Sequence, residues 1–244
     1  MSKKTEILYM PSIDSVYIKE FEANVIRVDE NGVVLDRTAF YPEGGGQLTD
    51  LGVLVQNGKE FPVKMVKKRG DKIMHVIDGD GPSEGPVTGI LDWERRYAHM
   101  KMHTAQHVVS AVAHVMFGAS TAGNQIHAQT SRIDLEPFRP TDEELEKLEE
   151  EVNKVLKSGV QIEVYTLSRE EAMEKVDPTR VNLSLLPEFI KELRMVDTKE
   201  IDICPCAGTH VKNTSEIGTI KIIGKKSKGK GRTRITYELI PPGQ

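Results

Sequence analysis

Two short segments, a hundred residues apart, carry the donor atoms of a possible metal site. In His103-Thr104-Ala105-Gln106-His107 the two imidazoles are four residues apart, which places both on one face of a helix. Cys206-Ala207-Gly208-Thr209-His210 offers a thiolate and an imidazole at the same spacing. Nitrogen and sulfur donors of this kind favour zinc over calcium or magnesium. We therefore predict that one zinc ion per chain is bound by His103, His107, Cys206 and His210.

The choice of helical ligands leaves an alternative open. His99, His103, His107 and His114 all lie near one face of the predicted helix, and His99 with His103 has the same spacing. Such a pair is also common on a solvated face or in a core. The metal site is favoured because the chain has only seven histidines and two cysteines, four of which fall in these two segments. Threonine at 104 argues against an H-E-x-x-H metalloprotease, which needs a glutamate there as its base.

The histidine pair must be positioned by a long helix. Asp92 is an expected N-cap and Gly118 the expected residue beyond the last turn, and the interval is rich in Ala, Met, Arg and Val. The pair would then lie in the middle of this helix. After it we expect a strand at 126–135, an acidic helix capped by Thr141 and running to about 156, a strand at 161–166, a short helix at 168–176, a strand at 193–203 leading into the cysteine segment, and a hairpin of 217–223 with 233–240.

Residues 8 to about 90 are predicted to form short strands and no long helix. β-Branched residues recur in the stretches 16–21, 23–28, 33–35, 52–55, 61–66 and 73–77. Asn31-Gly32 and Asn57-Gly58 separate pairs of these stretches, which is a strong hairpin signal. A small antiparallel barrel is the expected arrangement.

Residues 78–86 are rich in glycine and proline and are the predicted boundary between two domains. The expected fold class is α+β. A small N-terminal antiparallel β-barrel of residues 1–88 would be followed by a larger α+β zinc-binding domain of residues 89–244.

A glycine-rich segment lies within the barrel region. Three glycines follow one another in Tyr41-Pro42-Glu43-Gly44-Gly45-Gly46-Gln47. Glycines weaken a strand and cost backbone entropy, so the run indicates either unusual backbone angles or close approach by another group. A flexible loop explains the glycine content equally well. The segment matches neither a Walker motif nor a dinucleotide-binding fingerprint.

The connection inside the last hairpin is strongly basic. Residues 225–232 include Lys225, Lys226, Lys228, Lys230 and Arg232, in a chain whose net charge is −4. Such a cluster suits contact with nucleic-acid phosphates without readout of the bases. The alternative is a mobile, solvated loop tip.

Length and composition indicate a soluble globular protein. The chain has 244 residues, of which 38% are hydrophobic, enough for one large core or two smaller ones. No apolar run reaches 18 residues, and the N-terminus lacks the apolar stretch of a signal peptide. We therefore expect a cytoplasmic protein without a membrane partner. The two cysteines are separated only by Pro205 and cannot join distant parts of the fold, which fits thiols kept reduced for metal.

Three motifs together resemble one family. His103-Thr104-Ala105-Gln106-His107, Cys206-Ala207-Gly208-Thr209-His210-Val211 and Phe40-Tyr41-Pro42-Glu43-Gly44-Gly45-Gly46-Gln47 are similar to motifs of the editing domain of alanyl-tRNA synthetase and of its freestanding relatives, the AlaX proteins. They occur in the family's order, and the resemblance covers nearly the whole chain. The chain has no room for an aminoacylation core and looks like the medium AlaX type. Ala207 departs from the pattern, because synthetases commonly have glycine there.

The resemblance implies a trans-editing hydrolase with a zinc-dependent editing domain. Its substrate would be mischarged Ser-tRNA(Ala), with Gly-tRNA(Ala) as a further candidate, and its partner the acceptor arm of tRNA(Ala), held by the basic residues of 225–232. Thr38 and Gln125 are candidate polar groups for the serine hydroxyl, which alanine would leave unpaired. The pocket wall beside the amino acid would be formed by Gly44, Gly45, Gly46 and Gln47. Cys204 is a second sulfur that could replace Cys206 as a ligand.

Two alternatives share these features. A zinc-stabilised RNA-binding module without activity would need the same ligands and the same basic hairpin. Editing of Ser-tRNA(Thr) is the other, because the threonyl-tRNA synthetase editing domain has a related Cys/His set. The glycine-rich motif favours the alanine system.

Overall fold

The protein forms two compact units, residues 1–98 and 99–244, in a computed structural model that describes residues 4–181, 183, 187 and 189–241. The fold is α+β as expected, with a closed antiparallel barrel first and a mixed α+β unit second. The division falls after residue 98 and not at the expected residue 88, because the first six residues of a long helix, 93–98, belong to the first unit. Among the described residues, no helix is both long enough and apolar enough to span a membrane.

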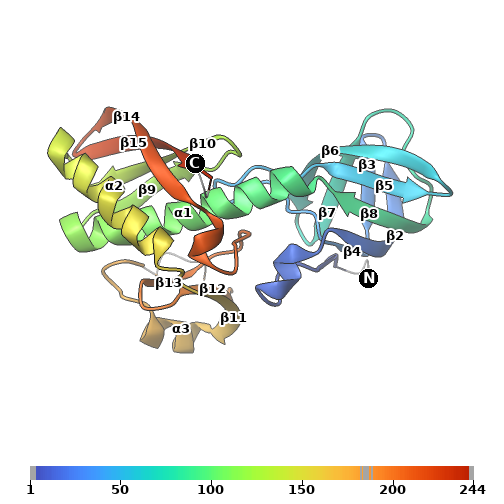
Figure 1. The fold of residues 1–244 in the computed structure, drawn as a ribbon. Helices are drawn as coiled ribbons and strands as arrows, with labels where there is room; N and C mark the ends of the chain where they lie inside the picture. The colour runs from blue at the N-terminus through green and yellow to red at the C-terminus, as the bar shows by residue number, and fades with distance from the viewer. Residues whose placement is uncertain (1–3, 182, 184–186, 188, 242–244) are drawn as a thin grey trace. The chain divides into compact units, whose positions relative to one another are not determined.

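Six antiparallel strands close the barrel of the first unit (Figure 1). Their order around it is β2 (Glu20–Asp29), β3 (Gly32–Leu35), β7 (Lys72–Ile77), β6 (Lys59–Arg69), β5 (Gly52–Gln56) and β8 (Gly85–Leu91). Side chains such as Leu54 and Val63 fill the interior and are almost fully buried. The unit also contains a parallel pair, β1 (Glu6–Ile7) with β4 (Arg37–Thr38), and a 3-10 helix, η1 (Asp14–Tyr17). η1 takes the place of the first part of the strand expected at 16–21.

β8 is the barrel strand that the sequence pattern does not predict. It begins inside the turn-rich stretch 78–86, which therefore leads into the barrel wall and not into a second unit. β8 pairs with β2 on one side and with β5 on the other. Gly89 weakens the strand signal, but a Cβ at this position would lie 2.4 Å from the ring of Phe21. Glycine is needed here because the aromatic ring fills the space.

The two Asn-Gly signals give different turns. Asn57 and Gly58 have positive φ, 52° and 77°, and form the predicted two-residue turn between β5 and β6. Between β2 and β3 the turn lies one residue earlier, at Glu30-Asn31. Gly32 already pairs with Asp29 there, so it belongs to the strand.

The glycine-rich segment is an ordered tight turn. The Gly44 N–H donates to the Gln47 carbonyl at 3.1 Å, and the Gln47 N–H donates to the Gly44 carbonyl at 2.9 Å. Between them Gly45 and Gly46 have φ of 57° and 86°, which residues with a Cβ adopt at a cost. The Tyr41 hydroxyl also donates to the Gly44 carbonyl at 2.8 Å. The prediction of unusual backbone angles is confirmed for Gly45 and Gly46, which lie in an ordered turn and not in a flexible loop.

A buried ion pair fixes the base of this turn. Asp50 and Arg96 are almost fully buried, and Arg96 Nε donates to Asp50 Oδ2 at 2.8 Å. The same oxygen accepts from the Tyr41 N–H at 2.7 Å, and the Asp50 N–H donates to the Tyr41 carbonyl at 3.0 Å. Arg96 also donates to the carbonyls of Val16 and Ala39. Because removing one charge would leave the other buried and uncompensated, the pair ties the turn firmly to the rest of the unit.

The described residues of the second unit form helices and two antiparallel sheets. The helices are α1 (Trp93–Phe117), which begins in the first unit, α2 (Asp142–Lys157), α3 (Arg169–Lys175) and the 3-10 helix η3 (Thr214–Glu216). The larger sheet has the order β14 (Thr219–Gly229), β15 (Arg232–Ile240), β10 (Thr130–Glu136) and β9 (Ser120–Gln125), and the smaller one the order β11 (Ile162–Ser168), β12 (Glu192–Thr198) and β13 (Asp202–Pro205). Figure 1 shows α2 running along the larger sheet, where the Ile220 N–H donates to Asn153.

The helix ends follow the signals in the sequence. Asp92 Oδ1 accepts from the Arg95 N–H at 3.1 Å, and Gly118 follows the last turn of α1 with φ of 64°. Thr141 and Ser168 begin α2 and α3 with reciprocal capping boxes. The predictions of these three helices are confirmed.

The smaller sheet contains a hairpin where the sequence predicts one strand at 193–203. The chain turns at Lys199-Glu200, where Glu200 has φ of 63°, so β12 and β13 pair antiparallel. Leu193 and Met195 belong to a core cluster with residues of α3. Successive side chains of a strand point to opposite faces. Arg194 therefore lies on the opposite face of the sheet. Val196, two residues further along, lies on the same face as Arg194, and Cys204 shares this face because it pairs with Val196.

Candidate metal centre

The four predicted metal ligands come together in the second unit. The donor atoms of His103, His107, Cys206 and His210 all lie within 4.8 Å of one another. Cys206 Sγ is 3.5 Å from His103 Nε2 and 3.4 Å from His210 Nε2. The imidazole centroids of His103 and His107 are 5.1 Å apart. The centroid of His210 lies 4.4 Å from that of His103 and 4.6 Å from that of His107. Three nitrogens and one sulfur at these distances could hold a metal ion.

The cluster selects one pair among the four histidines of α1. His103 and His107 are both buried in the middle of the helix. Among the described residues, the groups with metal-ligand spacing include neither His99 nor His114. The alternative pair of His99 with His103 is therefore not the one that meets the cysteine segment.

Thr104 orients His210. Its hydroxyl donates to the Met100 carbonyl at 3.0 Å and accepts from the Val211 N–H at 3.2 Å. His210 Nδ1 lies 3.2 Å from the same oxygen. Because the hydroxyl proton is used on Met100, Nδ1 must carry the ring proton and donate it. Nε2 is then left with its lone pair toward Cys206, the form that a metal ligand requires.

Cys204 has the corresponding place behind His107. Its Sγ lies 3.3 Å from His107 Nδ1, and its thiol also hydrogen-bonds the Asp202 carboxylate. Asp202 is held in turn by Arg180 at 3.1 Å. A proton on Nδ1 that points at Cys204 leaves Nε2 available to a metal. Cys204 and Asp202 form a second group of donors only by sharing His107, so Cys206 is the sulfur of the four-donor set.

Burial keeps the ligand histidines neutral. Desolvation, with neighbouring positive charge, lowers the pKa of His107 to about 3. The same causes lower the pKa of His103 and His210 well below the ordinary value, and neutral imidazole is the form that binds metal. Burial raises the pKa of the Cys206 thiol, against the Gly208 N–H and the Arg194 charge. A bound cation would supply the charge that turns this thiol into a thiolate.

Gly208 lets the cysteine segment pass against His103. A Cβ at 208 would lie 2.0 Å from His103 Cε1 and 2.4 Å from its Nδ1. The Gly208 N–H donates to Cys206 Sγ at 3.3 Å. The glycine thus leaves room for one ligand and hydrogen-bonds another. Ala207, where the chain departs from the Cys-Gly-Gly-Thr-His pattern, is exposed, so its methyl group is accommodated.

The other predicted site residues lie in both units. Thr38, in β4, is fully buried, and its hydroxyl lies 2.8 Å from His75 Nε2 and accepts from the Phe40 N–H at 3.1 Å. Gln125, at the end of β9, is partly buried, and Gln47 is fully buried. Contact of the substrate with these three residues stays a prediction. The same holds for Gly44, Gly45 and Gly46.

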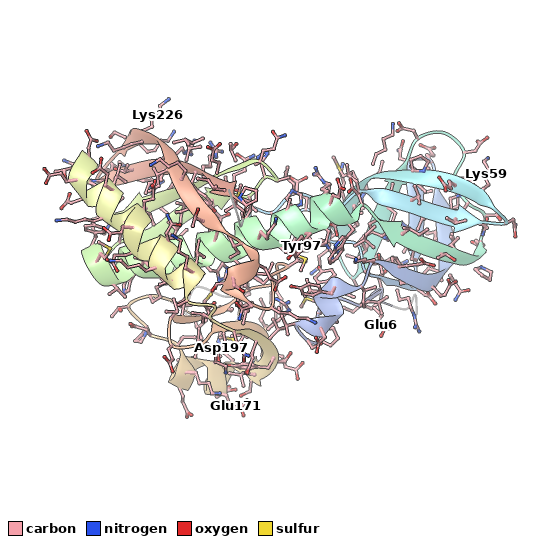
Figure 2. The ribbon with its side chains drawn as sticks, in the orientation of Figure 1. Glu6, Lys59, Tyr97, Glu171, Asp197 and Lys226 are labelled. Carbon is pink, nitrogen blue, oxygen red and sulfur yellow. The ribbon has the colours of Figure 1, made fainter. Side chains whose placement is uncertain are left out.

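The five basic residues of the last hairpin fall into two groups. Lys225 Nζ is 2.7 Å from Asp142, and Arg232 Nε is 2.8 Å from Glu136, so two of the charges are paired within the chain. The second group is Lys226, Lys228 and Lys230, which are all exposed. Figure 2 shows Lys226 on the β14–β15 hairpin with its side chain pointing away from the sheet. Most of the basic segment belongs to β14. The alternative of a mobile, solvated loop tip therefore applies only to the turn between β14 and β15.

Replacing Cys204 with alanine is expected to weaken metal binding by about 10- to 100-fold, the usual effect of removing a group that orients a ligand. Without the sulfur, His107 Nδ1 loses the partner that fixes its ring. Cys204→Ser keeps a hydrogen-bonding group and should retain most of the affinity. Competition with a chromophoric chelator measures this. Equal affinity in the wild type and both variants would show that Cys204 does not orient His107.

The spacing of the donors does not predict three supporting residues, Thr104, Arg194 and Gly208. Thr104 and Gly208 lie inside the two ligand segments, where spacing identifies donors but not the groups behind them. Arg194 donates through Nη1 to the Cys206 carbonyl at 2.6 Å, and its own carbonyl accepts from the Cys206 N–H at 3.0 Å. An arginine between apolar residues of a predicted strand was the available signal, because arginine is rarely buried without a partner.

Both units have counterparts in known protein families. Residues 5–95 match the family of tRNA synthetases class II (A). Residues 193–236 match the threonyl and alanyl tRNA synthetase second additional domain. The second match contains Arg194, Cys206 and His210, so it includes half of the four-donor set.

Full-length relatives cover the whole arrangement. The alanyl-tRNA editing protein AlaX-M of Methanosarcina barkeri is 43% identical over 247 residues, which cover 97% of this chain and 99% of that protein. AlaX-M of Saccharolobus solfataricus is 41% identical over 242 residues, which cover 97% and 100%. The alanine–tRNA ligase of Ignicoccus hospitalis is 38% identical over 227 residues, which cover 91% of this chain but 25% of the ligase. The similarity to the freestanding proteins therefore extends over both units.

Proposed function

This chain belongs to the AlaX-M family of alanyl-tRNA editing proteins, and we propose that it hydrolyses the ester of mischarged Ser-tRNA(Ala) to serine and free tRNA. Gly-tRNA(Ala) is the second proposed substrate of the same reaction. The observation that carries the proposal is the set of three buried histidines and one partly buried cysteine. It lies in the unit that contains the match to the threonyl and alanyl tRNA synthetase second additional domain.

Zinc is the metal that we propose for this set. Imidazole nitrogen and thiolate sulfur are zinc donors, whereas calcium and magnesium prefer oxygen. The residues that would hold it are His103, His107, Cys206 and His210. When bound, zinc supplies Lewis-acid chemistry that can orient the amino acid or polarise a carbonyl or a water. Because four protein donors fill a tetrahedral site, such chemistry needs an additional coordination position.

The reaction asks the protein mainly for placement and charge stabilisation. An oxygen of water forms a bond to the ester carbonyl carbon while the carbonyl electron pair moves onto its oxygen. The bond from that carbon to the ribose oxygen then breaks, and the ribose oxygen takes the proton of the water. Positioned groups lower the barrier by holding the ester and by stabilising the oxyanion. A buried group that bonds the serine hydroxyl would disfavour alanine, and Thr38 and Gln125 remain the proposed candidates.

Deacylation assays with matched substrates test the function. Ser-tRNA(Ala) should be hydrolysed faster than Ala-tRNA(Ala) and Ser-tRNA(Thr), and Gly-tRNA(Ala) is measured beside them. Treatment with a chelator should abolish hydrolysis, and zinc should restore it. A melting curve of the chelated protein separates a structural from a functional metal. Binding of tRNA without hydrolysis would favour the RNA-binding module, and faster hydrolysis of Ser-tRNA(Thr) would favour the threonine system.

Lys226, Lys228 and Lys230 are the proposed contact with the acceptor arm. Replacing Lys226, Lys228 and Lys230 with glutamine should raise KM more than it lowers kcat. The slope of log affinity against log salt concentration should fall by roughly 2 to 3, since each phosphate contact contributes about 0.7 to 0.9. Titrations between about 50 and 200 mM salt measure this slope.

Lys225 and Arg232 supply the matched control for this prediction. Both already pair with carboxylates of the chain, so neutralising them should change the salt slope less than the triple substitution does. An unchanged slope in the triple variant would move the contact to another surface. The basic residues of β6, Lys64, Lys67, Lys68 and Arg69, are the alternative.

A further inference from the structure

A buried cation lies beside the metal centre. Arg194 is only 7% exposed and stands in β12 between Leu193 and Met195, whose side chains belong to the core on the α3 side. Strand alternation turns Arg194 to the opposite face, the face of Cys204. Taking a guanidinium out of water is costly. A position that keeps one buried next to metal ligands therefore requires an explanation.

Arg194 is tied to Cys206 at two points. Its Nη1 donates to the Cys206 carbonyl at 2.6 Å. Its carbonyl accepts from the Cys206 N–H at 3.0 Å. One residue thus satisfies both main-chain polar groups of the sulfur ligand. Because the guanidinium is a rigid planar fork, these contacts hold its charge at a fixed place relative to the centre.

The guanidinium of Arg194 lies against the four-donor set. Its Nη1 is 2.6 Å from the carbonyl oxygen of Cys206, whose Sγ lies 3.5 Å from His103 Nε2 and 3.4 Å from His210 Nε2. A buried charge acts through a lower effective dielectric than a surface charge does. The guanidinium therefore places a strong, fixed positive potential at the metal centre.

We propose that Arg194 is a catalytic residue, whose guanidinium stabilises the negative charge that forms on the ester carbonyl oxygen when water attacks. The proposal rests on the deacylase function proposed above and names a group that this reaction uses. The carbonyl is neutral before attack and carries a negative charge once the water oxygen has bonded to its carbon. A fixed cation therefore favours the transition state over the bound ester.

Arg194 acts through its charge and keeps its proton throughout. A guanidinium stays protonated across the working range of enzymes, so it is not the acid that protonates the leaving ribose oxygen. That proton comes from the attacking water, as the balance of the reaction requires. The other role open to Arg194 is to position Cys206 alone, and this role predicts loss of metal together with loss of activity.

Variants that separate charge from main-chain support distinguish these roles. In Arg194→Gln, zinc content measured by elemental analysis should stay near the wild-type value while kcat for Ser-tRNA(Ala) falls about 100- to 1,000-fold, the range seen when one oxyanion-stabilising donor is lost. KM should change little. Arg194→Lys keeps a positive charge but not the planar guanidinium, so its kcat should lie between those of the wild type and Arg194→Gln. Arg27→Gln, at a partly exposed arginine of the barrel, controls for the loss of one positive charge.

Chemical rescue supplies a readout that a structural role would not move. Guanidinium ion at concentrations below those that unfold the protein should raise kcat of zinc-loaded Arg194→Ala and leave that of the wild type unchanged. If Arg194→Gln loses zinc, zinc-loaded Arg194→Lys decides, because low kcat at full zinc supports the proposal. Activity proportional to zinc in every variant, or full activity of Arg194→Gln, would overturn it. An inactive wild type would instead refute the proposed function itself.

Discussion

Replacing His103 with alanine is expected to leave far less than one zinc ion per chain and to reduce deacylation by more than about 100-fold, since loss of a group behind a ligand alone costs about 10- to 100-fold. His103 Nε2 lies 3.5 Å from Cys206 Sγ, inside the four-donor set. The three remaining donors cannot restore a tetrahedral site from protein groups. Elemental analysis of protein purified without chelator, beside the Ser-tRNA(Ala) assay, measures both effects.

Other histidines of α1 provide the controls. His114 lies on the same helix outside the four-donor set, so His114→Ala should keep its zinc. His99 has the right spacing to His103 but no place in the set, so His99→Ala should also keep zinc, whereas His107→Ala should lose it. Zinc loss in His99→Ala but not in His107→Ala would reverse this assignment and select the alternative pair.

The donors could be predicted from the sequence because their chemistry is encoded by type and spacing. A four-residue interval in a helix puts His103 and His107 on one face whatever surrounds them. The groups that orient these donors have no such code. Thr104 acts on His210 through an oxygen shared by three hydrogen bonds. That geometry exists only when α1 and the cysteine segment are packed together, so spacing along the chain could not reveal it.

The errors in the predicted strands also have specific causes. β8 escaped prediction because Gly89 makes room for a ring from β2, and a strand signal based on β-branched residues does not register such a fit. The strand expected at 126–135 begins only at Thr130, and β9 before it, rich in small and polar residues, carries little strand pattern. Pairing with neighbouring strands, and not their own residue pattern, makes β8 and β9 strands. Local propensity therefore located the helices better than these two strands.

Two arginines of the second unit, Arg232 and Arg194, illustrate the same limit. Composition marks Arg232 as part of a basic cluster, yet its charge is paired with Glu136. Arg194 lies in no cluster, yet its guanidinium is buried against the metal centre. Charge density along the chain finds surfaces that meet water. It does not identify an isolated arginine, such as Arg194, that is buried in the folded protein.

Replacing Gly208 with alanine is expected to destabilise the metal centre strongly. The added Cβ would lie 2.0 Å from His103 Cε1, so either the ring or the 206–210 backbone must move. Gly208 is not among the glycines with positive φ, and the obstacle is therefore space and not backbone angle. We expect zinc affinity to fall by more than about 10-fold and stability by about 1 to 3 kcal/mol, as for other overpacked sites. Ala207→Gly, at the exposed neighbour, should cost less than about 1 kcal/mol.

A double-mutant cycle identifies the clash itself. If the methyl group of Gly208→Ala is costly because it meets the imidazole of His103, the same substitution should cost much less stability in a His103→Ala background, measured by denaturant unfolding of the zinc-free proteins. The coupling free energy between the two substitutions would then offset a large part of the stability that Gly208→Ala alone removes. An equal cost in both backgrounds would mean that the methyl group strains the segment by itself. In that case the glycine would be required by the 206–210 turn and not by the ligand that lies against it.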